Sequence, residues 1–165
     1  MIRKLLFGAC IGGLIMGSFY EAPQEQLAQE QRLWQNIQSS NEKTRSRAEG
    51  ELLRIAGNKD GRNRAEAEAI YKQILAINPN SATAHTRLAE IQLKRWSRTK
   101  NLTDKESGLQ HLRKAIEFAR QNYNSVSENT PLLKEGASYY VKQLEKVESQ
   151  VNRGTPSHTW NFPKY

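Results

Sequence analysis

Besides the 17 carboxylates, three histidines and one cysteine are the residues of this chain that we consider first as metal ligands or catalytic groups. His85, His111 and His158 have no metal-ligand spacing among themselves or with the carboxylates. Cys10 is the only cysteine, so an intramolecular disulfide and a thiolate zinc site are both excluded. The chain also has no glycine-rich phosphate loop and no nucleophile elbow. We therefore predict no enzyme activity, no catalytic residue, no metal site and no cofactor.

A basic cluster with one aromatic ring is the second candidate for chemistry. It lies in a polar stretch that we expect to form a loop, and it comprises Lys94, Arg95, Trp96, Arg98 and Lys100. Cationic groups that meet a polyanion release its counterions, and an aromatic ring can stack on a base. Anionic lipid, a cell-wall polymer or an acidic protein fits better than nucleic acid, because the N-terminal segment directs the domain out of the cytoplasm.

Aromatic residues are concentrated at the C-terminus. Trp160, Phe162 and Tyr165 fall within the last six residues, in a stretch over 153–165 that we expect to be an extended tail. Exposed aromatic side chains commonly mark a docking site. The tail therefore docks either onto its own fold or into a partner.

The N-terminal segment over 1–20 is membrane-directed. Arg3 and Lys4 precede residues 5–20, which carry no charged side chain, and the length suits either a cleaved signal or a short retained anchor. The lack of a clean small-x-small cleavage site favours retention, and lipidation of Cys10 is a further alternative. Basic residues before the segment and acidic residues after it predict an extracytoplasmic domain, periplasmic in a bacterium and secreted if the segment is cleaved. Glycines spaced four apart in this segment also allow a homo-oligomer.

Composition places the remainder of the chain among helical proteins with a single domain. The 165 residues include 25% charged and only 37% hydrophobic residues, with few glycines and prolines, and the net charge is +8. The basic excess favours an acidic partner without identifying it. We predict an all-α fold with a helical stalk over 21–40 and a helical domain over 41–152.

Capping and turn residues predict where the helices begin and end. Hydroxyl or amide residues followed three positions later by glutamate indicate helix starts near Asn41, Asn63 and Thr103, and Thr130-Pro131 indicates the start of the last helix. The stretch from Gly57 to Gly61 is expected to end the first of these helices, and Asn78-Pro79 the second. Two helices over 64–93 should then pack as an antiparallel hairpin.

The spacing of small, aromatic and proline residues resembles that of tetratricopeptide repeats. Ala67-x3-Tyr71-x2-Ile74-x4-Pro79 is similar to the second helix of one repeat, and Ala82-x-Ala84-x3-Leu88-Ala89 to the first helix of the next. Gly108-x3-Leu112-x2-Ala115 resembles a weaker second copy, displaced by an insertion at 94–105. The resemblance implies a short α-solenoid of antiparallel helix pairs, closed by a C-terminal capping helix.

The resemblance also implies a binding mode. First helices of such pairs line a concave groove, which here would place Thr83, Thr86, Glu90 and Leu93 toward a partner. Thr86 and Glu90 do not match the basic residues that grip a peptide C-terminus, so no carboxylate clamp is expected. We predict a membrane-tethered scaffold for protein–protein interaction in an envelope-associated complex. The alternative is a basic accessory module that binds a polyanionic surface.

Overall fold

The computed structural model of the chain describes residues 24–125 and 131–163. The expected anchor or signal segment at 1–20, including Cys10, and the tail residue Tyr165 lie outside these ranges. Within the described residues, no helix is both long and apolar enough to cross a membrane.

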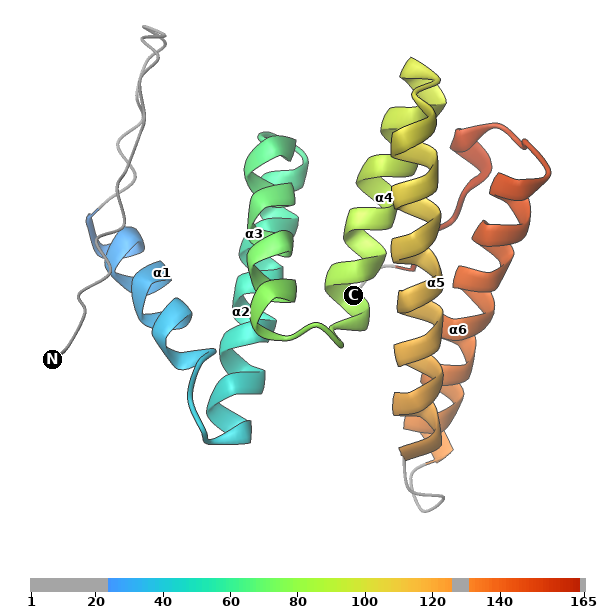
Figure 1. Cartoon of the computed structure of the whole chain (residues 1–165). Coiled ribbons are helices and arrows are strands. Elements are labelled where there is room, and N and C mark those ends of the chain that lie inside the picture. Colours follow the sequence, from blue (N-terminus) through green and yellow to red (C-terminus); the bar gives the residue numbers. More distant parts are fainter. Residues whose placement is uncertain (1–23, 126–130, 164–165) are drawn as a thin grey trace, which may run out of the picture.

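Six α-helices and one short 3-10 helix make up the described residues, which contain no strand (Figure 1). The prediction of an all-α fold is confirmed. Each helix packs against the one that follows it, and successive helices alternate in direction. The helices are α1 (Gln24–Asn36), α2 (Glu42–Asp60), α3 (Arg64–Ile77), α4 (Ala82–Thr99), α5 (Leu102–Ser125), α6 (Pro131–Asn152) and the 3-10 helix η1 (Ser157–Thr159).

Side-chain caps begin three of these helices. The side-chain oxygen of Asn41 accepts a hydrogen bond from the Thr44 amide, so Asn41 begins α2 as its N-cap. Asn63 accepts from the amide of Glu66 at 3.3 Å and donates to the Glu66 carboxylate at 3.1 Å, which fixes the start of α3. Ser81 caps α4 in the same way. These interactions agree with the predicted helix starts near residues 41 and 63.

One predicted helix end is confirmed and one is wrong. Helix α2 ends at Asp60 with Gly61 as its C-cap, within the stretch that was expected to end it, whereas α4 continues through Lys94 to Thr99, where a loop was expected. Between Lys94 and Thr99 the sequence has no glycine or proline, and Lys94 pairs with Glu90 one turn earlier, so nothing interrupts the helix. Lys100 then adopts a left-handed conformation at φ 59°, which reverses the chain before α5 begins at Leu102. The expected insertion at 94–105 therefore lengthens two helices.

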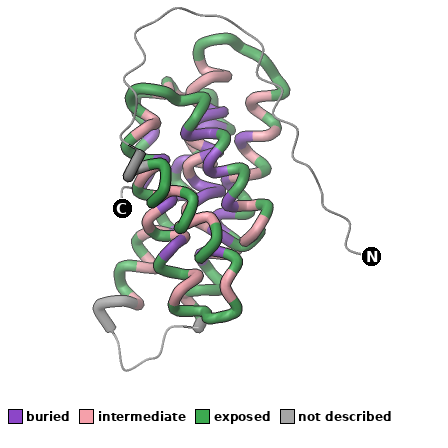
Figure 2. Tube along the Cα trace, turned by 90° about the vertical axis from the view of Figure 1, so that its left-hand side faces the viewer, coloured by how far each residue is buried: buried purple, intermediate pink, exposed green. Residues whose placement is uncertain are grey.

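Buried side chains form two clusters, and α4 contributes residues to both. Figure 2 shows the buried residues gathered toward the inside of the trace. One cluster joins α2, α3 and the inner face of α4 to Ile37, which follows α1. The other joins α4, α5, α6 and the C-terminal residues Trp160 and Phe162. Ala84, Leu88 and Ile91 belong to the first cluster, whereas Ala89 and Leu93 belong to the second. The predicted stalk over 21–40 thus contributes one fully buried residue, Ile37, to the first cluster.

Helices α4 and α5 approach closely where Gly108 faces Leu93. A Cβ atom added to Gly108 would lie 2.7 Å from the Leu93 Cγ and 3.2 Å from the Leu93 backbone nitrogen. The backbone atom cannot move aside without shifting α4, so the contact requires glycine. The small residue that opens the second, weaker repeat-like spacing therefore lies where α4 and α5 approach.

Replacement of this glycine should therefore destabilise the protein. We expect Gly108→Ala to lower the free energy of unfolding by about 1–3 kcal/mol, because overpacking exceeds the gain in helix propensity. Gly136→Ala in α6 is the matched control, since nothing lies within 4 Å of its added Cβ, and it should raise stability by up to about 1 kcal/mol. Urea denaturation checks both values, and equal effects of the two variants would contradict the close contact.

Candidate functional site

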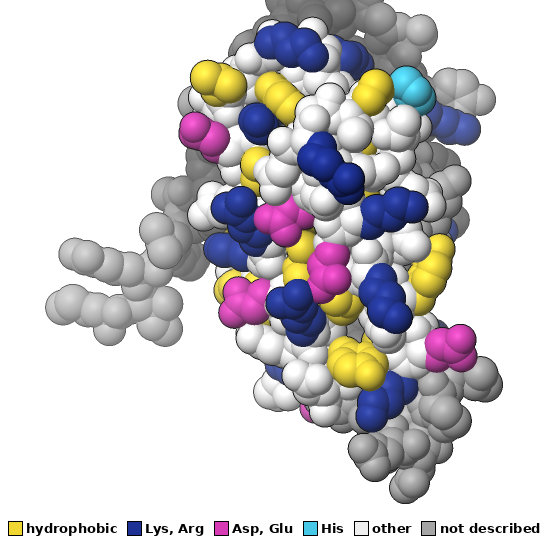
Figure 3. All heavy atoms as spheres, turned by 90° about the vertical axis from the view of Figure 1, so that its right-hand side faces the viewer, with side chains coloured by type: hydrophobic (Ala, Val, Ile, Leu, Met, Phe, Trp, Pro, Cys, Tyr) yellow, Lys and Arg dark blue, Asp and Glu magenta, His cyan; other side chains and the backbone are white. Residues whose placement is uncertain are grey.

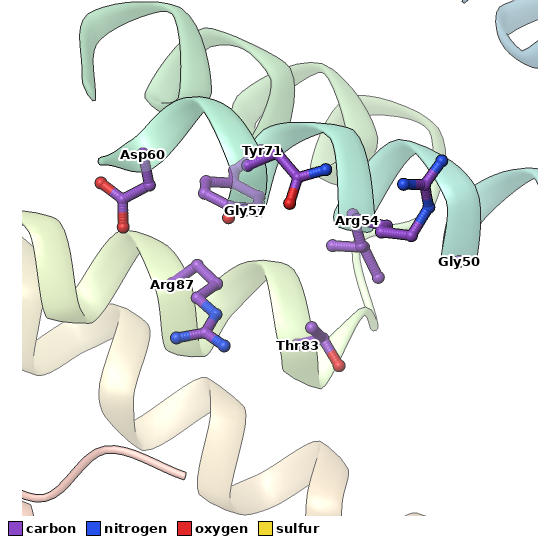
Figure 4. Close-up of a pocket in the computed structure, with 9 residues that line it drawn as sticks. Gly50, Arg54, Gly57, Asp60, Tyr71, Thr83 and Arg87 are labelled. Atoms are coloured by element: carbon purple, nitrogen blue, oxygen red, sulfur yellow. The ribbon is translucent and has the colours of Figure 1, made fainter. Parts of the chain in front are cut away.

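A hollow between α2 and α4 is the best-formed candidate site among the described residues. Its volume is about 670 Å³, within the range typical of ligand sites. Figure 4 shows residues of α2 along one side and residues of α4 along the other. The lining residues are Gly50, Leu53, Arg54, Gly57, Asn58, Asp60, Tyr71, Thr83 and Arg87.

Two glycines of α2 leave room for the hollow. Gly50 and Gly57 are separated by two helical turns and lie on the same face of α2. An added Cβ at Gly50 would meet no atom within 4 Å, and one at Gly57 would meet only the Tyr71 hydroxyl at 4.0 Å. Packing therefore does not demand glycine at either position. Glycine destabilises a helix by about 1 kcal/mol relative to alanine. The two glycines therefore lower the stability of α2 and leave its surface open at the hollow.

Tyr71 of α3 forms the wall of the hollow beside Gly57. Its side chain is fully buried, and its hydroxyl has no hydrogen-bond partner among the described residues. Burial raises the pKa of Tyr71 to about 12, and Asp60 and Glu90 reinforce the shift while Arg87 opposes it. The hydroxyl therefore stays protonated at neutral pH and can donate a hydrogen bond.

The charged residues that line the hollow are each paired within the chain. Arg54 pairs with Glu51 at 2.8 Å, Asp60 accepts from Arg64 at 3.1 Å, and Arg87 pairs with Glu90 at 2.9 Å. The lining thus includes two arginines and one aspartate, and each of them is held in an ion pair. Among the lining side chains, the Tyr71 hydroxyl is a buried donor without a partner in the part of the chain that the structure describes.

The predicted groove residues have different positions in the structure. Thr83 lines the hollow, and Glu90 lies close enough to pair with both Arg87 and Lys94. Thr86 and Leu93 are fully buried, which corrects the prediction that all four face a partner. The Thr86 hydroxyl contacts the Tyr140 hydroxyl of α6 at 2.7 Å, and Leu93 packs on Gly108. Helices α5 and α6 cover this side of α4, so the accessible hollow lies toward α2.

The predicted basic cluster belongs to the end of α4 and is partly neutralised. Arg95 pairs with Asp104 of α5 and with Glu68 of α3, each at 2.8 Å, and these hydrogen bonds raise its pKa. Lys94 pairs with Glu90 at 2.7 Å, and the Arg98 guanidinium donates to the Lys94 carbonyl. Lys100 lies over the Trp96 ring. Figure 3 shows acidic and basic side chains interspersed on another face, that of α5 and α6.

The C-terminal aromatics dock onto the fold itself. Trp160 is 7% exposed and Phe162 is 5% exposed, and both join the cluster around α4, α5 and α6. The Trp160 ring stacks on Trp96 with a centroid distance of 6.1 Å and an interplanar angle of 7°. The expected extended tail therefore contains η1 and a buried aromatic contact. Of the two docking modes expected for the tail, the structure shows docking onto its own helices.

Two histidines that the sequence does not associate meet between α4 and α5. His85 Nδ1 and His111 Nδ1 lie 2.8 Å apart, and His85 Nε2 lies 3.0 Å from the Pro79 carbonyl oxygen. The carbonyl only accepts, so His85 Nε2 carries a hydrogen and its Nδ1 accepts from His111. No signal in the sequence marks this pair, because the two residues are 26 positions apart on different helices. His158 is exposed in η1.

The paired nitrogens are occupied by each other, which leaves little for a metal. Among the described residues, no group of three or more histidine, cysteine, aspartate or glutamate side chains could hold a metal ion. The pair instead fixes α5 against the turn that precedes α4. Phe118 stacks on His85 with ring centroids 5.7 Å apart and extends this contact.

Comparison with known proteins adds no relative. No protein-family model matches the chain, and neither a curated protein nor a solved structure matches it. The site must therefore be interpreted from its own geometry.

The histidine pair should make stability depend on pH. Burial lowers the pKa of His85, and burial together with His85, Lys114 and Lys72 lowers that of His111 to about 4, against the opposing charge of Glu68. Between about pH 4 and 6.5 these histidines bind more protons in the unfolded chain than in the folded one. The free energy of unfolding should therefore fall as the pH decreases from about 6.5 to 4. His111→Gln should reduce this loss, as measured by urea denaturation across the range.

A matched histidine controls for this effect. His158 is exposed, so His158→Gln should leave the pH dependence of stability as it is in the unmodified protein. Equal pH profiles for the two variants would show that the buried pair does not carry the dependence.

Removal of the tail should expose the second cluster. Truncation after Arg153 deletes Trp160 and Phe162, and loss of a buried aromatic side chain typically costs about 3–5 kcal/mol. We expect a large drop in melting temperature for the truncated chain and a smaller one for Trp160→Ala, both measured by circular dichroism. Replacement of the exposed Asn161 by alanine is the control, and an unchanged melting temperature after truncation would contradict self-docking.

Proposed function

We propose that the protein is a membrane-tethered scaffold, similar to a short tetratricopeptide array, that holds a partner protein in the hollow between α2 and α4. The hollow is the observation that supports this proposal most, because α2 has two glycines there that its own packing does not require. The partner belongs to an envelope-associated complex, and residues 1–20 supply the tether. The function requires no cofactor and no catalytic group.

The arrangement of the helices supports the comparison with tetratricopeptide repeats. Ala67, Tyr71 and Ile74 are fully buried, as the small-aromatic-apolar spacing requires, and Asn78-Pro79 separates α3 from α4. If α2 and α3 form one pair and α4 and α5 the next, α2 and α4 are the two first helices. First helices line the concave side in such arrays, and the hollow lies between these two. In this arrangement, α6 and the docked tail cover the open end of the second pair.

The alternative, a basic module that binds a polyanionic surface, has less support. Lys94 and Arg95 are paired with acidic residues, and the charged residues that line the hollow are paired as well. Affinity for a polyanion would fall steeply with salt, whereas binding in an apolar hollow would change little. The salt dependence of partner binding therefore separates the two functions.

Site-directed photocross-linking of the full-length chain in native membranes tests the scaffold. A photoreactive residue at Thr83, inside the hollow, should form one discrete cross-linked product, whereas the same residue at the exposed Glu117 of α5 should not. Adding Gly50→Phe should abolish the product, because a large side chain at this lining position takes up space in the hollow, and its Cβ meets no atom within 4 Å.

Gly136→Phe in α6 is the matched control for the blocking variant, since its added Cβ also meets nothing within 4 Å. It should leave the Thr83 product intact. Equal products from positions 83 and 117, or a product that survives Gly50→Phe, would contradict binding in the hollow.

A further inference from the structure

We infer that the hollow takes an extended, uncharged peptide segment of the partner, whose apolar side chain lies over Gly50 and Gly57 and whose main-chain carbonyl accepts a hydrogen bond from Tyr71. This inference rests on the proposed scaffold function and adds the chemistry of its ligand. It depends on three observations: the two glycines, the buried hydroxyl and the pairing of each lining charge within the chain.

The length of the hollow suits a short extended segment. Its lining runs from Gly50 to Asp60 along α2, which is about 15 Å at 1.5 Å per residue of helix. An extended chain covers about 3.3 Å per residue, so four or five residues match this length. Each glycine lies where a side chain would otherwise stand, so an apolar side chain of the ligand can take that space.

The Tyr71 hydroxyl selects an acceptor. It is fully buried, it lines the hollow, and it has no hydrogen-bond partner among the described residues. A buried donor without a partner is unfavourable, and an acceptor brought by a ligand removes this cost on binding. Main-chain carbonyls are the acceptors that every extended peptide offers at regular intervals.

The pairing of the lining charges disfavours a charged ligand. Arg54, Asp60 and Arg87 line the hollow, and each already pairs with a residue of opposite charge within the chain. A charged side chain of either sign would have to lose its hydration and meet a like charge in the hollow. An uncharged side chain meets neither cost.

Titration with short peptides tests this specificity on the full-length chain in phospholipid nanodiscs. The probes are blocked pentapeptides Gly-Ser-Leu-Ser-Gly and two matched forms with aspartate or lysine in place of leucine. Selective ¹⁵N labelling of the ten glycines makes the Gly50 and Gly57 amides reporters and the Gly136 amide a control. We expect saturable shifts of the first two signals with the leucine peptide, and at least fivefold weaker binding of the charged peptides.

Tyr71→Phe separates a binding role from a structural one. Since the hydroxyl has no partner in the free protein, its removal should leave the melting temperature unchanged or raise it. The same variant should bind the leucine peptide about fivefold more weakly, the effect of one lost hydrogen bond. Thr86→Val is a control that removes a buried hydroxyl away from the hollow, and it should lower stability without changing binding by folded protein.

The outcomes distinguish this inference from the scaffold function. If the Thr83 cross-link forms and depends on an open Gly50, the scaffold stands. If the leucine peptide then fails to bind, a charged peptide binds equally well, or Tyr71→Phe binds without loss, the inferred ligand chemistry is wrong. If the cross-link does not form, the scaffold function itself fails.

Discussion

Helix α4 is buried from both sides, and the rest of the structure depends on this constraint. Ala84, Leu88 and Ile91 close the cluster with α2 and α3, while Ala89 and Leu93 close the cluster with α5, α6 and the tail. A helix with buried residues on so much of its surface cannot be solvated. Neighbouring helices must therefore surround it, and the hollow exists where α2 leaves one part of that enclosure incomplete.

The sequence predicts the helical segments well where local chemistry decides them. Asn63 and Glu66 fix the start of α3 through hydrogen bonds between themselves. Pro79 stops α3 from continuing, because proline has a fixed φ angle and no amide hydrogen in any context. Where a residue type permits two outcomes, the prediction fails. The polar residues after Leu93 were expected to form a loop, but they continue α4 because no residue among them opposes a helix.

The candidate site is less predictable because it depends on which helices become neighbours. Thr83 could be placed in a groove by comparison with repeat proteins, but the burial of Thr86 and Leu93 results from the contacts of α5 and α6. The seven-residue spacing of Gly50 and Gly57 is a usable signal for the hollow, because it places both glycines on one face of the helix when both are assigned to that helix. The meeting of His85 with His111 had no such signal, since it depends on the angle and register of two long helices.

The docked tail sets the order in which the fold can be completed. The first cluster uses residues between Ile37 and Ile91, and their contacts join neighbouring helices. The second cluster needs Trp160 and Phe162, which follow Trp96 by more than sixty residues. A chain emerging from the ribosome can therefore form its first half by local contacts while α5 and α6 still lack their aromatic cover. During that interval the surface of Trp96 that Trp160 later covers stays exposed, and the second cluster is complete only when the last aromatic residues arrive.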